Sequence, residues 1–434
     1  MRAVVQQRRV LHPAGAGRPV ELLRPDPEPE HLLARDLHSA RSFLYVHGMK
    51  KARLATALLF LLYGTLIGVW TARIPAVKEH LGLSDGLLSL ALLALAAGAI
   101  TGMQLVGTLV DRFGTRRVLT PVALADGFLL IPVALAPNLA TLALALFAFG
   151  VVHGTLNVAM NARGVEIERA WGSPIMSSFH AAYSIGGFLG AAAGGAFAAA
   201  GAGPVVTFAS VAVVMAAVTA WAVAQSFEAT REHPATEVRQ NPGPLRGVLL
   251  LGGLAFCALI GEGAAADWST VYVRDSLGGS AALAAGAYAA FFAAMTAGRL
   301  AGDPLTARFG PVAVVRAGGL LAAGGLGAAL LVHHPIAGVI GFGCLGAGLS
   351  TIAPQVFSAA GARNPDRPAR AIARAASIGW LGFFAGPVLI GGGAALTGLP
   401  VALAIPVVLA AVIVVAARAV DVRSSGVPVA AAGR

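Results

Sequence analysis

The sequence carries little charge for its length. Of its 434 residues only 12% are Asp, Glu, Lys or Arg, whereas 57% are hydrophobic. Soluble globular domains carry roughly twice that share of charged residues, which they need in order to cover a water-facing surface. A soluble fold is therefore excluded for most of the chain, and lipid is the expected solvent.

Cysteine and the common catalytic motifs are also scarce. Cys257 and Cys344 are the only cysteines, and each lies in an apolar run, so neither a disulfide framework nor a cysteine metal site is expected. The nucleotide-binding GxxxxGK[ST], the zinc-binding HExxH and the nucleophile elbow are absent from the sequence. We therefore predict no enzyme activity and no cofactor or metal, and ATP-driven transport would need a separate subunit.

Long apolar runs dominate the remainder of the chain. Twelve of them approach or exceed the roughly 20 residues that a helix needs to cross the hydrocarbon. They predict an all-α integral membrane protein with spans at 54–73, 86–110, 118–136, 139–160, 175–200, 204–225, 247–271, 281–302, 312–332, 335–358, 371–394 and 398–417. A polar, proline-containing break at 226–246 predicts a cytoplasmic linker between six-helix bundles at 51–225 and 247–420.

The two ends of the chain differ from this apolar region. Residues 1–50 are rich in Arg, Pro, Glu and His, and they predict either a disordered cytoplasmic tail or an over-extended start. The second option is raised by Met49, which stands directly before basic residues and the first span. Residues 421–434 are expected to form a cytoplasmic tail.

Basic residues are distributed unequally between alternate loops. One set of loops holds only Arg73, Lys78 and Arg274, and the other holds fourteen arginines: Arg112, Arg116, Arg117, Arg163, Arg169, Arg231, Arg239, Arg246, Arg308, Arg316, Arg363, Arg367, Arg370 and Arg374. The positive-inside rule places the arginine-rich loops and both termini in the cytoplasm, in a multi-pass protein of the inner (plasma) membrane. The net charge of +11 has the same origin, so no nucleic-acid partner is expected.

The two bundles repeat landmarks at similar spacing. Trp70 precedes Arg112 by 42 residues, and Trp268 precedes Arg308 by 40 residues, with an Arg-Phe-Gly triplet at each arginine. Duplicated halves related by pseudo-symmetry produce such matches, and they are the usual build of secondary transporters. The sequence thus predicts two pseudo-symmetric six-helix halves.

The loop after the second span carries a specific pattern. It reads Gly, three residues, Asp-Arg, one residue, Gly and then basic residues, formed by Gly107, Asp111, Arg112, Gly114, Arg116 and Arg117. This loop resembles the signature loop of the major facilitator superfamily, and the resemblance implies a cytoplasmic latch that favours one conformation. In the second half Ala307 stands where Asp111 does, and the latch is expected to use Arg299 and Asp303, which lie four residues apart on one helix face.

Three further segments, at 157–166, 176–186 and 261–268, resemble the fucose-permease-like, sugar-transporter-type branch of that superfamily. The resemblance implies that spans one, four, seven and ten line a central cavity. Polar side chains inside spans are costly and usually functional, although hydrogen bonding between helices is the alternative reading. The predicted substrate-cavity residues are Tyr63, Trp70, His153, Asn157, His180, Tyr183, Glu262 and Gln355.

Three acids lie inside predicted spans. Glu262 is deepest in a cavity-lining span, and because a low-dielectric medium favours a neutral carboxyl group it is the predicted proton-coupling residue. His153 and His180 are rival proton carriers. Asp267 is predicted to form an outer gate with Arg73, and Asp126 to serve helix packing or a peripheral pair.

Together these features predict a secondary active transporter that moves a small polar solute by alternating access. The solute is expected to be sugar-like, or another metabolite or drug. The other expected partners are the lipid bilayer and protons, and a monomer is expected. An uncoupled uniporter and a non-transporting membrane sensor or scaffold remain open as alternatives, and the sequence specifies neither the substrate nor the direction of transport.

Overall fold

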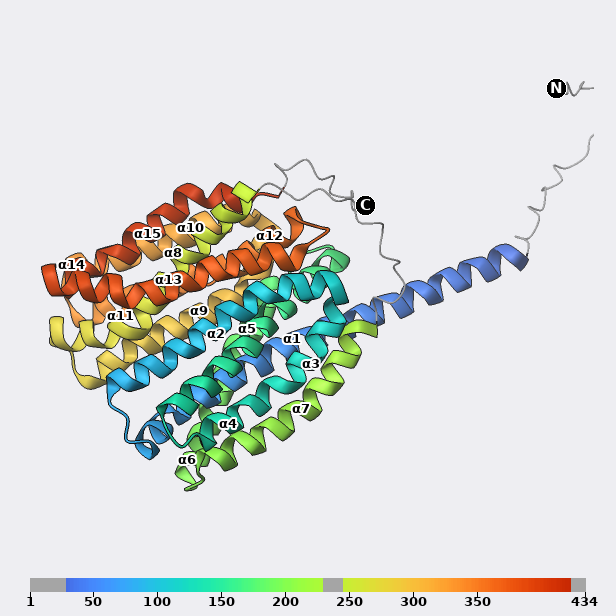
Figure 1. Cartoon of the computed structure of the whole chain (residues 1–434). Helices are drawn as coiled ribbons and strands as arrows, with labels where there is room; N and C mark the ends of the chain where they lie inside the picture. Colours follow the sequence, from blue (N-terminus) through green and yellow to red (C-terminus); the bar gives the residue numbers. More distant parts are fainter. Residues whose placement is uncertain (1–28, 229–244, 423–434) are drawn as a thin grey trace, which may run out of the picture. The chain divides into compact units, whose positions relative to one another are not determined.

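The computed structural model describes residues 29–228 and 245–422, and the elements within them are helices (Figure 1). The chain divides into a unit that ends at Val46, in which residues 29–46 are helical, and a unit from His47 onward. Within the described residues, 12 helices are long and apolar enough to cross a membrane. The predicted all-α fold with twelve spans is therefore confirmed.

Six spans form the first half of the protein. The third span is divided into α3, the short 3-10 helix η1 and α4. The elements are α1 (Pro29–His80), α2 (Asp85–Phe113), α3 (Thr115–Ala125), η1 (Asp126–Leu129), α4 (Leu130–Leu135), α5 (Leu139–Trp171), α6 (Met176–Ala199) and α7 (Pro204–Glu228).

Six spans also form the second half, and three of them are divided into shorter elements. The elements are α8 (Leu245–Val271), η2 (Tyr272–Ser276), α9 (Ala281–Phe309), α10 (Pro311–Val332), α11 (Pro335–Leu349), α12 (Ile352–Arg363), α13 (Pro368–Thr397), α14 (Leu399–Ala402), α15 (Ala404–Ala416) and η3 (Ala417–Val420). The observed spans overlap the predicted ones throughout, because helix length is fixed by the need to satisfy backbone groups across the apolar layer.

The predicted boundaries outside the spans agree only in part with the structure. The helix α1 begins at Pro29, inside the segment 1–50 that was expected to be a disordered tail or an over-extended start. Between Pro29 and Gly48 the sequence has no proline or glycine and is rich in Leu, Ala and Arg, which favour a helix. Most of the predicted linker, 229–244, and most of the predicted C-terminal tail, 423–434, lie outside the described residues.

Glycines allow α1 and α6 to approach each other closely. A Cβ atom on Gly186 or Gly190 of α6 would overlap the carbonyl oxygen of Leu61 or Thr65 in α1. The two backbones lie so close at these positions that no side chain fits between them. Small residues such as glycine permit this close packing of membrane helices. The first and fifth spans can therefore bring their polar side chains close together.

The two halves pack against each other most extensively along two pairs of helices. The helix α2 packs against α13 (Figure 1), and α6 packs against α9. The short loops at Gly114, 172–175, Gly310 and 364–367 all lie at the same end of the bundle, which we call the basic end because of its arginines. The opposite end carries the loops at 81–84, 200–203 and 277–280.

The glycine contact gives a test of the packing. Replacing Gly190 by Ala should lower the melting temperature and the yield of folded protein, because its methyl group would collide with the backbone of α1. Gly195, on the same helix, has open space where a Cβ atom would lie, so Gly195→Ala is the matched control and should be neutral or slightly stabilising. Thermal unfolding of the two purified variants would measure this, and equal melting temperatures would contradict the packing described.

Candidate functional site

A cavity of about 130 Å³ lies between the two halves. The first half contributes side chains from α1, α5 and α6, and the second half from α8, α9, α12 and α13. Six of the eight predicted substrate-cavity residues line it: Tyr63, His153, Asn157, His180, Tyr183 and Glu262. Arg299 is the remaining polar residue of the lining, and Phe60, Phe357 and Trp380 supply aromatic surface.

The other two predicted cavity residues lie elsewhere. Trp70 is buried within the first half, where its ring lies 6.3 Å from that of Phe208. Gln355 is buried too, and its amide donates to Thr306 at 3.0 Å, inside the second half. Both residues fill the interior of their own half, where Gln355 forms an interhelical hydrogen bond and Trp70 an aromatic contact.

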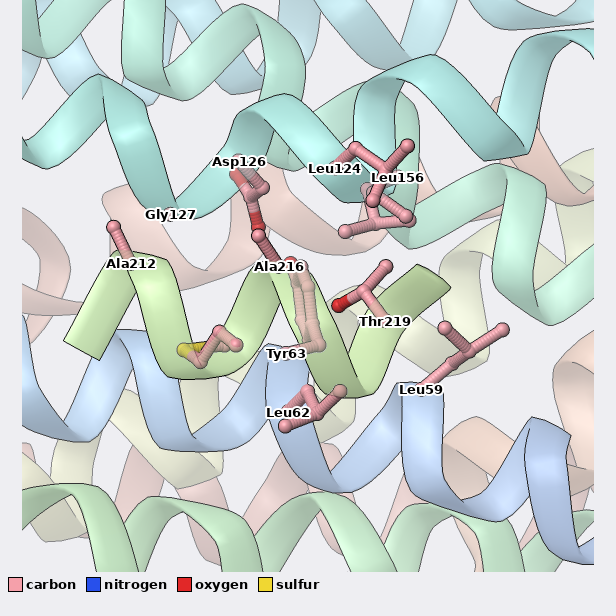
Figure 2. A pocket seen from close by; sticks show the side chains of 12 residues that line it. Leu59, Leu62, Tyr63, Leu124, Asp126, Gly127, Leu156, Ala212, Ala216 and Thr219 are labelled. Carbon is pink, nitrogen blue, oxygen red and sulfur yellow. The ribbon is translucent and has the colours of Figure 1, made fainter. Parts of the chain in front are cut away.

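The first-half wall of the cavity is an ordered polar cluster. The His153 ring stacks on Tyr63 with 3.8 Å between ring centroids, and its Nδ1 lies 2.9 Å from Oδ2 of Asp126. The Asn157 amide donates to the Tyr63 hydroxyl at 3.2 Å. Figure 2 shows Tyr63 reaching from α1 toward Asp126, with α7 passing beside them.

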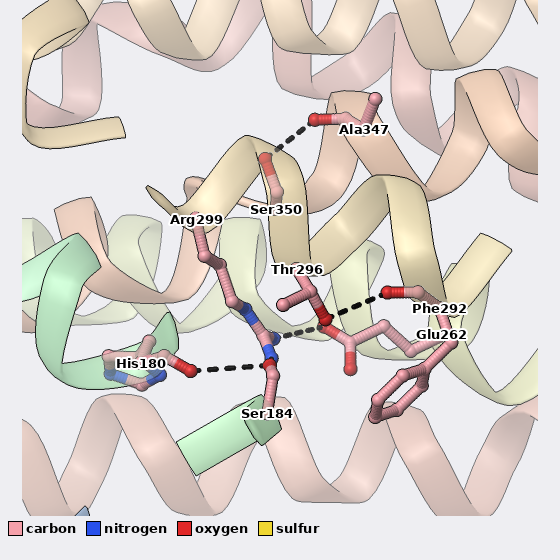
Figure 3. A network of polar contacts seen from close by, with 8 residues as sticks. All are labelled: His180, Ser184, Glu262, Phe292, Thr296, Arg299, Ala347 and Ser350. Atoms are coloured by element: carbon pink, nitrogen blue, oxygen red, sulfur yellow. Dashed lines mark hydrogen bonds and ion pairs between the residues drawn. The ribbon is translucent and has the colours of Figure 1, made fainter. Parts of the chain in front are cut away.

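The second-half wall carries the charges. Arg299 of α9 donates to Ser184 Oγ of α6 at 2.6 Å, and its other terminal nitrogen lies 3.8 Å from Glu262 Oε1 (Figure 3). The Arg299 side chain is only 5% exposed and that of Glu262 is 21% exposed. The two charged groups are thus close enough to attract each other but too far apart to form a hydrogen bond.

His180 lies at the first-half side of this cluster. Its Nε2 lies 3.2 Å from the side-chain oxygen Oδ1 of Asn161. Its ring also contacts the rings of Phe60 and Phe357, with centroid distances of 5.4 Å and 5.7 Å. Phe357 belongs to the second half. His180 is therefore held by one hydrogen bond and by two rings, one from each half.

The predicted latch residue Asp111 joins the halves at the basic end. Its Oδ2 lies 2.6 Å from Nε of Arg370 and 3.9 Å from Nε of Arg367, both near the start of α13. A Cβ atom on Gly107 would come within 2.7 Å of Arg370 Cγ, so glycine there lets the arginine approach. In contrast, Arg112 lies over the neighbouring Phe113 ring, and Arg117 is exposed.

A second set of contacts at the basic end surrounds the start of α6. Asp303 of α9 accepts hydrogen bonds from the backbone N–H groups of Ser177 and Ser178, at 2.8 and 2.9 Å. Glu168 accepts from the N–H groups of Ile175 and Met176, both at 2.9 Å. The first N–H groups of a helix have no partner within the helix and carry its positive dipole end, so carboxylates satisfy them well.

Glu168 and its neighbour also reach the second half. Ser358 of α12 donates to Glu168 Oε1 at 2.6 Å, and Arg169 donates to the carbonyl oxygen of Gly361. Of the two predicted second-half latch residues, Asp303 thus crosses between the halves at the basic end. Arg299 also crosses, but it does so at the cavity, one helical turn deeper.

The predicted outer-gate residues do not contact each other in this conformation. Arg73 is buried and donates to the carbonyl oxygen of Ala202 at 2.5 Å, in the loop between α6 and α7. Asp267, near the end of α8, is exposed. We predict that they pair in the inward-facing state.

Comparison with known proteins agrees with this geometry. The family described as Major Facilitator Superfamily matches residues 20–167 and, in a second match, 54–361. An uncharacterised MFS-type transporter of Yersinia pestis is 34% identical over 85% of this chain and 95% of its own length.

This chain belongs to the major facilitator superfamily. An uncharacterised transporter of Sinorhizobium fredii is 36% identical over 76% of the chain and 88% of its own length. Membrane protein MosC of Rhizobium meliloti is 30% identical over 82% and 87%. The chain is therefore a multi-pass transporter of this superfamily, and these relatives are membrane proteins and transporters rather than enzymes.

Solved structures show the same fold. The MFS transporter FucP in its outward conformation superposes with a TM-score of 0.72 at 17% identity, covering 85% of this chain and 98% of FucP. The proton:xylose symporter XylE gives a TM-score of 0.66 at 14% identity over 85% and 95%. The fold is thus the one expected of the fucose-permease-like branch.

Sequence reasoning missed three residues that the structure brings to the site. Asp126 was assigned to helix packing or a peripheral pair, but it bonds to the cavity residue His153. Arg299 was assigned to the latch alone, and Glu168 to no site. A signal was available for Asp126 and Arg299, because each is a charged group inside an apolar span, where a partner is required. Glu168 lies beyond the predicted fourth span and carried no such signal.

The Asp111 contacts lead to a prediction on the latch. Asp111→Asn removes the charge that holds Arg370 and Arg367, so it should leave the fold intact and reduce transport about tenfold or more by altering the balance of conformations. Uptake in proteoliposomes and thermal unfolding would measure the two effects. Asp275→Asn, which removes an exposed carboxylate at the opposite end, is the control and should transport normally. Full activity of Asp111→Asn would show that Asp111 does not act as a latch.

Proposed function

We propose that the chain is a proton-coupled secondary active transporter that moves a small polar solute by alternating access. The observation that carries this proposal is the cavity between the halves, lined by an ionisable pair and closed at the basic end by contacts from both halves. We further propose that it works as a monomer in the inner (plasma) membrane with the basic end and both termini in the cytoplasm, as the arginine distribution indicates.

In this proposal the structure corresponds to the outward-facing state. Among the described residues, the hydrogen bonds and ion pairs between the halves at Asp111, Glu168, Arg169 and Asp303 all lie at the basic end. With the basic end closed, the cavity would receive solute from outside. The similarity to FucP in its outward conformation supports the assignment.

The chemistry of the lining supports a hydrogen-bonding solute with some apolar surface. Tyr63, Asn157 and His153 offer hydrogen-bond donors and acceptors on one wall, while Trp380 and Phe357 offer flat aromatic surface. Sites with a few convergent polar groups in an otherwise apolar wall are typical of small-molecule binding. A sugar-like molecule fits both kinds of surface, and the lining suits other polar metabolites as well.

Glu262 and Arg299 supply a route for coupling. When Glu262 is ionised it attracts Arg299, and when it is protonated that attraction is lost. Since Arg299 also donates to Ser184 of the first half, protonation would change a contact that links the two halves at the cavity. Proton uptake and the movement of the halves are connected in this way.

This coupling predicts a specific phenotype for Glu262→Gln. The variant should still exchange solute across the membrane, because exchange needs no net proton movement, but it should not accumulate solute on a proton gradient. Counterflow and gradient-driven uptake in proteoliposomes would separate the two activities, with a substrate found by thermal-shift screening of sugars and metabolites.

The outcome of that experiment discriminates between the alternatives. Normal accumulation by Glu262→Gln would make Glu262 structural. If the unmodified protein shows no dependence on the proton gradient, an uncoupled uniporter replaces the proposal. If compounds bind to the unmodified protein but none of them is exchanged across the membrane, a non-transporting sensor is favoured.

Alternating access also predicts a rearrangement at the outer ends of α1 and α8. In the inward-facing state Arg73 should leave Ala202 and pair with Asp267, since the two halves close together at that end. A structure of the inward-facing state would show the charged atoms of the two side chains within about 6 Å of each other. Side chains well beyond that separation would rule the outer gate out.

A further inference from the structure

A buried acid outside the coupling pair has its own connection to the cavity. Asp126 is 3% exposed and His153 is 5% exposed, and their side chains lie 2.9 Å apart between the third and fourth spans. Burying an ionised carboxylate in an apolar layer is costly unless its charge is compensated. Each of the two groups therefore needs a polar partner inside the bundle, and the other group supplies it.

The backbone of the third span is distorted at this acid. The helix α3 ends at Ala125, the 3-10 helix η1 occupies Asp126–Leu129, and α4 begins at Leu130. A pocket of about 10 Å³, the room of roughly one water molecule, lies against Asp126, Tyr63 and Thr219 (Figure 2). The second carboxylate oxygen, Oδ1, is buried and accepts no hydrogen bond from the residues that the structure describes.

His153 connects this acid to the central cavity. Its Nδ1 faces Asp126, and the residue also lines the cavity. Nothing in the described part of the chain bonds to its Nε2. An imidazole whose two nitrogens face an acid and a cavity can accept a proton at one and release a proton at the other.

We propose that Asp126 and His153 form a proton-binding site in the first half, reached from the central cavity through the His153 ring. Before this proton binds, in the proton-free state, an ionised Asp126 accepts a hydrogen bond from the Nδ1–H group of a neutral His153 imidazole. A proton from the cavity binds Nε2, and the Nδ1 proton passes to the Asp126 carboxylate. The pair gains one proton and its charge changes from −1 to zero.

The groups around the pair define what else can influence it. Tyr63 of α1 stacks on His153, and Thr219 of α7 lines the small pocket. Across the cavity lie Glu262 and Arg299 of the second half. The site is therefore separate from Glu262 in structure, and it does not depend on the coupling role proposed for that residue.

Proton binding has a direct consequence for the cavity wall. The proton changes which His153 nitrogen carries hydrogen, and His153 stacks on the Tyr63 ring whose hydroxyl accepts from Asn157. The neutral pair presents Nε2–H, a donor, to the cavity, whereas the proton-free pair presents Nε2 as an acceptor. One bound proton thus reverses the hydrogen-bonding character of this part of the wall.

Infrared difference spectroscopy tests the proposal on the full-length protein in lipid without any substrate. Spectra are recorded as the pH is stepped between about 4 and 9, a range that covers the ordinary titration of carboxyl and imidazole groups. Protein made with 13C-labelled aspartate separates the carbonyl stretch of a protonated Asp from that of Glu262. We expect a protonated-Asp band that is isotope-shifted and varies with pH.

Variants assign that band. Other aspartates, among them the buried Asp303, also contribute to a protonated-Asp band. The Asp126 component is therefore the difference between the unmodified protein and Asp126→Asn, and Asp267→Asn and Glu262→Gln should retain that component. His153→Gln preserves a hydrogen-bonding group but cannot titrate, so it should move the midpoint of the band by about one pH unit or more. Circular dichroism and size-exclusion chromatography check folding, and if Asp126→Asn does not fold, the His153→Gln midpoint decides.

Three results would overturn the proposal. They are a protonated-Asp band whose size is unchanged in folded Asp126→Asn, an Asp126 component that does not vary with pH, and a midpoint of that component that is unchanged in His153→Gln. Because no transport is measured, failure here leaves the proposed transport function standing, and loss of coupling in Glu262→Gln leaves the Asp126 band in place.

Discussion

Carboxylates that bind helix termini and arginines hold the two halves together at the basic end. Asp303 satisfies the first N–H groups of α6 from the opposite half, and Asp111 binds the arginines that begin α13. In lipid such backbone groups cannot be left without partners. Separation of the halves at this end therefore requires water to replace these contacts, which makes closure and opening two distinct states rather than a continuum.

The position of the cavity follows from that closure. With the basic end joined, the remaining space between the halves lies where Arg299 meets Ser184 and Glu262. Each half brings one acid inside a span with a basic partner, Asp126 with His153 and Glu262 with Arg299. The first pair lies within its own half, whereas Arg299 of the second also contacts the opposite half, so only the second is directly sensitive to the movement of the halves.

The number of spans, the duplication and the superfamily could be predicted from the sequence, because run length and loop charge are local properties. Most of the cavity wall was also predictable, since polar residues on one helix face are rare in apolar spans. Trp70 and Gln355 show the limit of that argument, because a face that is polar or aromatic can point into its own half. The places of Asp126 and Arg299 at the site could not be predicted in this way, because they depend on contacts between segments that are distant in the sequence.

Paired distance measurements test alternating access of the two halves most directly. Spin labels at Ser173 and Ala307 report on the basic end, and labels at His80 and Asp275 report on the opposite end; all four positions are exposed. In lipid nanodiscs at differing pH and with a binding solute, the account predicts that one distance lengthens as the other shortens. Distances that stay fixed in every condition, or that lengthen and shorten together, would contradict it.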